Sequence, residues 1–491
     1  MKKGIFSLLL LFSVNCLFSQ SIPLEVVNVD RTSVDESLYP GAQKLQGNIH
    51  FKQGDAHLYC DSGFFYPSQN RLLAQGQVRL IQGGFKATCF ELDYAGDTRL
   101  ALLQGSVQLT EGNQRLRTQR VEYRTDTRVG SYRSKGQIDA PGIRATSDSG
   151  FFYRDQSLVL LIGNARLNDQ SISIQADSIG YKKDSELLLF YQKTNFKVDG
   201  QTGKCNGGYY SKSNQQGKLF NQVQIIDSMG NELICDTFLW NKKEDIQEVF
   251  GRFCYQDSSK SQMIWGKHLK RWAKNDSIEV HQDVLVKWIS ENDTSFLFTD
   301  TLIGNTNEYR AFPRNHLKND STVGICELLE YNKKDSTIRL KNNPMIWNQD
   351  FQISSIWIAQ KKEFQNQRMD CFDSCFVLQW VDCCHTNQIK SDTLTMTFGN
   401  DQSKSLFAKG RVMTIYYDVT GKKIERETEV SADKLRLTWI DGKIKFLSYQ
   451  RNPKITMIKP SKKGKQLEGF RPKREQYFEE INFWNSINRI Y

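Results

Sequence analysis

The sequence has few prolines, and it has no long apolar run beyond its N-terminal segment. Only nine prolines among 491 residues exclude a proline-rich linker protein, and 33 glycines without a Gly-X-Y period exclude a collagen. No later apolar run approaches the roughly 20 residues that a membrane-spanning helix needs. The hydrophobic fraction of 39% is modest for a thick globular core, yet it is too high for a disordered chain.

The common catalytic motifs are also missing. The six histidines are scattered, and none of them lies in an H-E-x-x-H pattern. The sequence contains neither a G-x-S-x-G elbow nor a phosphate-binding glycine loop. Acidic residues are frequent in expected turns, so a paired-carboxylate glycosidase stays open on motifs alone. We expect a protein that is not an enzyme and that needs no cofactor.

The N-terminal segment, over positions 1–19, has the pattern of a secretory signal peptide. Lys2 and Lys3 precede an apolar run over positions 5–14, and the small residue Ser19 follows at a suitable cleavage position. Two alternatives are a buried N-terminal helix and a lipoprotein cysteine at Cys16. The signal predicts export of the chain.

The positive charge is concentrated at the C-terminus. The net charge is +11, and residues 451–491 carry ten Lys or Arg against four Glu. The remaining body is close to neutral, which argues against a nucleic-acid-binding protein. A basic tail of this kind is either a solvated terminus or a contact for an anionic surface or an acidic partner.

A small residue recurs along the chain at a fixed 29-residue step. This marker residue stands at Cys60, Cys89, Thr118, Ser147, Ala176 and Cys205. With longer steps it continues at Cys235, a weak copy around Trp265, Thr299, Cys326, Ser355, Ser391 and Ala432. Self-similarity at such a period is the signature of a repeat architecture in which each unit buries its apolar face against its neighbours.

The residues around each marker predict strands. An aromatic residue often follows five positions later, as at Tyr94 and Tyr123, and the stretches after each glycine alternate apolar and polar side chains. One whole repeat is too long for a single strand, so we expect about three short strands in each repeat. The alternation slips by one residue at Asp236, which indicates a corner or bulge. The acidic residues and asparagines at this position are expected to be corner residues rather than acid catalysts: Asp61, Asp177, Asn206, Asp236, Asp300, Asp392 and Asp433.

Ten cysteines remain after removal of the predicted signal. Five of them share the marker position, where small buried filler is the expected role, although an exported chain also permits disulfides between adjacent copies. Cys371, Cys375, Cys383 and Cys384 cluster with His385. Their spacing matches no standard zinc site, so we expect disulfides or free thiols there and no metal.

The serial pattern resembles the OstA-like family, which includes the periplasmic lipopolysaccharide-transport protein LptA and the N-terminal domain of LptD. The resemblance is carried by G-[NQS]-[VI]-x-Φ followed, after a gap, by a small residue, Asp, an apolar residue and Tyr. It is clearest over residues 47–66, 76–94, 105–123 and 163–181. It implies an all-β, elongated, repeat-built and twisted jellyroll, in which two splayed antiparallel sheets form an apolar trough for lipid acyl chains.

The resemblance implies a domain order and a function. We expect a signal peptide over 1–19, clear OstA-like repeats over 20–255, degenerate repeats over 256–450 and the basic tail over 451–491. The implied role is that of a periplasmic lipid-binding bridge that shields lipopolysaccharide acyl chains on their way to the outer membrane, and an association with that membrane stays open. The implied partners are lipopolysaccharide and the inner- and outer-membrane transport components, with no nucleic acid. Head-to-tail association with further copies of this chain is a further option.

The alternating apolar residues are the candidate lining of the trough. They are Ile49, Phe51, Val78, Leu80, Val107, Leu109, Ile172 and Ile174. The same residues are able to pack a closed core, and from the residues alone the closed core is favoured. A structural or adhesive surface β-solenoid with such a core is the alternative function, and a polysaccharide-active β-helix enzyme is a third.

Overall fold

A computed structural model of the chain describes residues 22–170, 172–290, 293–363, 366–399, 404–421, 423–440 and 443–487. The predicted signal peptide over 1–19, with Cys16, lies outside these residues. The chain divides into two compact units between Val198 and Asp199. The described residues are almost entirely strands, which confirms the predicted all-β class.

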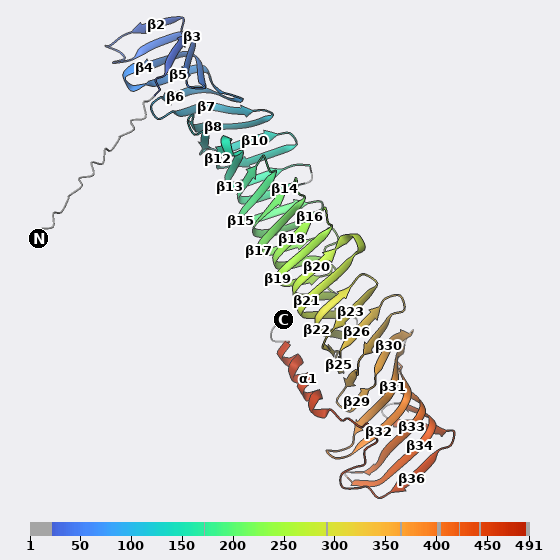
Figure 1. The fold of residues 1–491 in the computed structure, drawn as a ribbon. Helices are drawn as coiled ribbons and strands as arrows, with labels where there is room; N and C mark the ends of the chain where they lie inside the picture. The colour runs from blue at the N-terminus through green and yellow to red at the C-terminus, as the bar shows by residue number, and fades with distance from the viewer. Residues whose placement is uncertain are drawn as a thin grey trace, which may run out of the picture. The chain divides into compact units, whose positions relative to one another are not determined.

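The first unit is a series of antiparallel strands that pair mostly in chain order (Figure 1). Its strands are β1 (Glu25–Asn28), β2 (Arg31–Val34), β3 (Gln43–Gln53), β4 (Ala56–Tyr66), β5 (Arg71–Gln82), β6 (Phe85–Ala95), β7 (Leu100–Glu111), β8 (Gln114–Arg124), β9 (Val129–Tyr132), β10 (Gly136–Ala140), β11 (Ile143–Ser147), β12 (Ser149–Tyr153), β13 (Leu158–Asn168), β14 (Ile172–Lys182) and β15 (Leu187–Val198). Each early repeat therefore holds two long strands, such as β4 with 11 residues and β5 with 12 residues. The expectation of three short strands was wrong.

Each long strand is interrupted near its middle by a bulge, which explains how strands of this length fit the fold. In β5, Gly76 and Gln77 both adopt positive φ, at 75° and 40°, and together they face Asp61 of β4. The same two-against-one arrangement places Gly251 and Arg252 opposite Asp236 in the second unit. A bulge bends a strand and shifts its alternation by one residue. The predicted corner role of Asp61 and Asp236 is thereby confirmed.

The bulges divide the folded sheet into two arms. In β5 the first arm holds residues 71–75 and the second arm holds residues 78–82. Around β9–β12 the division is complete, because β9 pairs with β12 in the first arm while β10 pairs with β11 in the second. Inner side chains of both arms belong to one buried cluster that runs from Leu24 to Tyr132. The arms of these repeats therefore face each other across a common interior.

The second unit continues the same construction with less regular strands. They are β16 (Gln201–Ser211), β17 (Gln216–Ile226), β18 (Glu232–Asn241), β19 (Ile246–Gln256), β20 (Gln262–Trp272), β21 (Ser277–Ile289), β22 (Thr294–Gly304), β23 (Glu308–Phe312), β24 (Asn315–Lys318), β25 (Val323–Cys326), β26 (Leu328–Asn332), β27 (Thr337–Lys341), β28 (Met345–Trp347), β29 (Phe351–Ser354), β30 (Trp357–Glu363), β31 (Asn366–Trp380), β32 (Thr386–Phe398), β33 (Lys404–Thr420), β34 (Lys423–Ile440), β35 (Lys443–Gln450) and β36 (Lys454–Ile458). β22 pairs with β23 through one half and with β24 through the other, so two arms are present here as well.

The basic tail packs against the outside of the second unit. Its residues 474–487 form helix α1 (Arg474–Ile487), drawn in red in Figure 1. Trp484 and Ile487 of the helix are buried in one cluster with Leu285, Val323 and Trp347. The helix and its docking were not expected for a solvated tail on an all-β chain. The apolar spacing Tyr477–Ile481–Trp484 was the available signal, since residues three and four apart share a helix face. Among the described residues, no helix is long and apolar enough to cross a membrane.

Candidate functional site

The predicted trough residues form one inward-facing row on the second arm. Seven of the eight are at most 5% exposed, and Ile172 is half-buried. Ile49, Phe51, Val78, Leu80, Val107 and Leu109 belong to the continuous buried cluster of the first repeats. In those repeats the row packs a core, as the interpretation from the residues alone favoured. The lipid-lining role of the row stays a prediction.

The marker residues lie beside the bulges, on the side of the interior where the two arms are joined. All those predicted are buried except around Trp265, where Gly266 takes the inward position opposite Phe253. Only a small side chain fits where the two arms meet, which explains the recurrence of Cys, Ser, Thr and Ala. The marker cysteines are free thiols among the described residues. Burial raises the pKa of Cys60 and of Cys235 to about 12, which keeps these thiols protonated.

The opposite side of the interior is closed by hydrogen bonds between the tips of the two arms. The Tyr94 hydroxyl, on the first arm, donates to the amide oxygen of Gln53, on the second. The Gln53 amide also donates to the Gly96 carbonyl oxygen at 3.0 Å. Each arm extends from the bulge by about 3.3 Å per residue. If the two arms diverged, their tips would lie too far apart to form a hydrogen bond. The contact between Tyr94 and Gln53 therefore shows that the arms come together again at their tips. We call this pair of tip residues a latch.

The latch is repeated one 29-residue step later. The Tyr123 hydroxyl donates to the Gln82 side-chain oxygen at 2.6 Å, and the Gln82 amide donates to the Thr125 carbonyl at 2.8 Å. Tyr94 and Tyr123 are both 0% exposed. These tyrosines were recognisable in the sequence as a recurrent aromatic position, but their partners were missed. The signal was present, because Gln53, Gln82 and Glu111 each end a strand just before a glycine turn.

The third latch has a different chemistry. Phe152 stands where a third tyrosine would be, and it has no hydroxyl to donate. Instead, the guanidinium of Arg154 contacts Glu111 at 2.7 Å and donates to the Tyr123 hydroxyl at 2.9 Å. The same guanidinium carbon lies 4.6 Å from the ring centre of Phe85. The Arg154 side chain is only 11% exposed, so it plugs the interior at this level.

A cavity of about 260 Å³ opens beside this plug. Its walls come from both arms: Phe85, Leu109, Leu116 and Ile138 from the second, and Tyr132, Phe152, Val159 and Tyr181 from the first. Ile138, Phe152, Val159 and Tyr181 are only half-buried. The exposed cations Arg115 and Lys183 also line it. The cavity is therefore apolar between the arms, with positive charge at its edge.

Half-buried aromatic residues also occupy the inner tips of the second unit. Tyr210 and Trp240 stack with ring centres 6.0 Å apart, and Tyr309 stacks on Tyr331 at 6.1 Å. All four are half-buried. Tyr210, Trp240 and Tyr331 are repeats of the position that Tyr94 and Tyr123 hold in the first unit. The same sequence position is thus sealed in the early repeats and partly open later.

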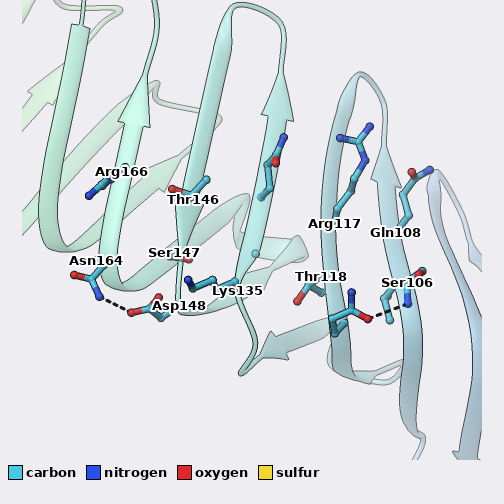
Figure 2. A pocket seen from close by; sticks show the side chains of 14 residues that line it. Ser106, Gln108, Arg117, Thr118, Lys135, Thr146, Ser147, Asp148, Asn164 and Arg166 are labelled. Carbon is cyan, nitrogen blue, oxygen red and sulfur yellow. Dashed lines mark hydrogen bonds between the residues drawn. The ribbon is translucent and has the colours of Figure 1, made fainter.

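The larger hollows lie elsewhere and are lined mostly by polar and charged residues. One of about 880 Å³ lies on the outer face of the second arm and at the bulges, where Figure 2 shows Arg117, Lys135 and Arg166 around it. Asn164 donates to Asp148 at 2.6 Å on its wall. Another, of about 1040 Å³, lies along the bulges from Asp236 to Thr301. Neither has the apolar lining that an acyl chain needs.

The cysteine and histidine cluster predicted near position 380 does not converge on one point. Cys371 and Cys375 are buried in β31, whereas Cys383 and Cys384 are exposed in the following turn, with their sulfurs 3.4 Å apart. His385 faces the Asp382 carboxylate and the Ser461 carbonyl, each at 2.9 Å. Among the residues that the structure describes, no group of three or more metal-ligating side chains comes together.

The architecture defines a class of protein: a repeat-built antiparallel β-structure with an apolar interior between two arms. The sequence model of the family described as OstA-like protein matches residues 22–177. This confirms the resemblance over residues 22–177. The match ends before position 255, up to which the repeat was expected to be clear. No curated protein matches the chain.

Proposed function

We propose that this protein is a periplasmic lipid-binding bridge that resembles LptA and shields the acyl chains of lipopolysaccharide on their way to the outer membrane. The observation that carries the proposal is the apolar cavity between the arms, whose walls include the half-buried side chains of Ile138, Phe152, Val159 and Tyr181. Burying a methylene group contributes about 0.8 kcal/mol. A chain of a dozen carbons therefore gains on the order of 10 kcal/mol before the cost of ordering it.

The charges around the cavity suit an anionic amphiphile. Arg115 and Lys183 line it, and both are exposed. Glu111, the acidic residue of the lining, is paired with Arg154. An acyl chain between the arms would leave a phosphorylated head group near these two cations, which supports lipopolysaccharide as the ligand.

In this proposal the protein is not an enzyme, and its work is to hide apolar carbon from water. Direction would come from the inner-membrane transport components, and delivery would be to those of the outer membrane. The OstA-like match over residues 22–177 supports this setting.

Two experiments test the proposed function. Mass spectrometry of protein purified from the bacterial envelope should find lipopolysaccharide bound to it. Delipidated protein should rebind lipopolysaccharide in mild detergent, and failure to do so would count heavily against the proposal.

Val159→Asp places a charge on the inner wall and should weaken binding of lipopolysaccharide at least tenfold. Ile162→Asp is the matched control in the same strand, because Ile162 points outward and is 37% exposed.

The sealed interior of the first repeats favours one alternative. A structural or adhesive surface β-solenoid would use a closed core and bind ligands outside, for which the polar hollow in Figure 2 offers a place. This alternative predicts envelope protein without bound lipid. It also predicts equal behaviour of the Val159→Asp and Ile162→Asp variants in every lipid assay.

A further inference from the structure

The latches divide the first unit into a sealed and an open segment, and Arg154 stands at the boundary. We infer that acyl chains bind only in the cavity beside Arg154 and on the inner surfaces that follow it, and that β3–β5 form a lipid-free segment. The inference rests on the proposed function and adds to it where the lipid path begins.

The sealed side is closed by interactions that a lipid would have to break. Gln53 and Gln82 each bridge the arm tips through two hydrogen bonds, and both glutamines are at most 5% exposed. An acyl chain that entered here would part these groups and offer them no polar partner. A buried polar group left without its partner is destabilising, and this penalty recurs at each latch. The inner residues Leu58 and Leu80 are already at most 2% exposed, so no room is left for a chain.

Arg154 lies at the end of the series of latches and contacts residues of two successive latch levels. Its guanidinium pairs with Glu111 and donates to Tyr123, so it ties the second and third latch levels together. It also donates weakly to the Gln82 carbonyl, at 3.4 Å. The side chain therefore closes the sealed segment with polar groups and at the same time forms one wall of the apolar cavity.

The sequence explains why the series stops. One 29-residue step after Glu111 stands Ala140, at the end of β10, and its expected partner is Tyr181. An alanine methyl group cannot accept the tyrosine proton, so no latch forms at this level. Tyr181 is half-buried and lines the cavity, whereas the latched Tyr94 and Tyr123 are fully buried. The cavity therefore opens at the level where Ala140 replaces the glutamine or glutamate of the earlier latches.

Hydrogen–deuterium exchange of the mature full-length protein, with and without lipopolysaccharide, locates the bound lipid. We expect slower exchange in peptides from β10–β14 and no change in peptides from β3–β5. Equal slowing in both sets would overturn the inference while leaving the proposed function in place. Slowing in neither, together with no lipid bound, would instead contradict the proposed function.

A designed latch gives a second test. Ala140→Gln places at this level the side chain that Gln53 and Gln82 supply in the earlier repeats, opposite the native Tyr181. The variant should lose at least tenfold in lipopolysaccharide affinity and should unfold at a higher denaturant concentration. Adding Tyr181→Phe removes the hydroxyl partner, so the double variant should regain most of the affinity. If Ala140→Gln binds lipopolysaccharide as wild type does, the inference is wrong.

Discussion

The bulge is the smallest unit of this fold, and at Gly76 and Gly251 a glycine of the bulge faces an acidic side chain. At Gly251 the backbone has φ +83°, and a Cβ there would lie 2.7 Å from the Cβ of Asp236. Asp236 cannot easily retreat, because its carboxylate accepts the Arg252 amide at 2.9 Å. The slip in alternation was enough to identify Asp236 from the sequence. The positive φ of Gln77 and Ser106 was not predictable, because glutamine and serine have no preference for a left-handed backbone.

Replacing the bulge glycine should cost more than replacing a turn glycine with the same backbone. Gly251→Ala and Gly230→Ala both force alanine into positive φ, at about 1–2 kcal/mol. Gly251→Ala adds a collision with Asp236, for about 1–3 kcal/mol more. At Gly230 (φ +87°) the nearest atom to a new Cβ is 3.4 Å away. Urea unfolding of both variants measures the difference, and equal midpoints would show that the bulge tolerates a side chain.

The cysteines should separate into two classes by reactivity. Burial raises the pKa of Cys60, Cys89 and Cys326 to about 12, so at pH 8 only about one such thiol in 10,000 is ionised. Cys383 and Cys384 are exposed. Brief alkylation at pH 8, mapped by peptide mass spectrometry, should therefore modify these two residues and spare the marker cysteines. Unfolding in urea should make all of them react, and rapid labelling of Cys60 in the folded protein would contradict the buried marker position.

At the scale of the element, strands were predictable and their number per repeat was not. Alternation identified strands such as Val78–Leu80, but the count of three per step assumed that strands stay short. Bulges allow β4 and β5 to run for 11 and 12 residues, and a bulge is visible in the sequence only as a one-residue slip. The helix in the tail was missed for another reason. Its packing partners lie far upstream in the chain, in β21–β28, so the charge of the tail was more conspicuous than its apolar face.

Helix α1 should contribute to the stability of the second unit. Trp484 is 1% exposed, and its ring centre lies 5.9 Å from that of Phe296. Trp484→Ala should destabilise this unit by about 3–5 kcal/mol, because it removes a large buried side chain. Phe478→Ala, on the same helix, should change stability by no more than about 0.5 kcal/mol, since Phe478 is 54% exposed. Denaturant unfolding compares them, and equal effects would mean that the helix does not stay docked in solution.

At the scale of the whole molecule, the repeat was predictable and its variation in openness was not. The 29-residue step alone indicated an interior built by stacking, and the buried marker residues confirm it. Whether that interior is sealed depends on pairs such as Gln53 and Tyr94, which are distant in the sequence and meet only once both arms are folded. The residues alone favoured a closed core and the family resemblance implied an open trough. In the first unit, the interior is a closed core in the repeats before Arg154, and an apolar cavity opens beside Arg154.

If the apolar interior binds acyl chains, the binding affinity should increase with the length of the acyl chain. If the acyl chain lies between the arms, each added methylene contributes up to about 0.8 kcal/mol, or roughly a fourfold gain in affinity. We expect single-chain phosphorylated amphiphiles with acyl chains of increasing length to bind with steadily rising affinity in calorimetry, with a negative heat-capacity change. Val159→Asp should flatten this series, and Ile162→Asp should leave it unchanged. An affinity that depended on the phosphate and ignored chain length would place binding on the outer basic surface, near Arg117 and Arg166, and would remove the physical basis for acyl shielding.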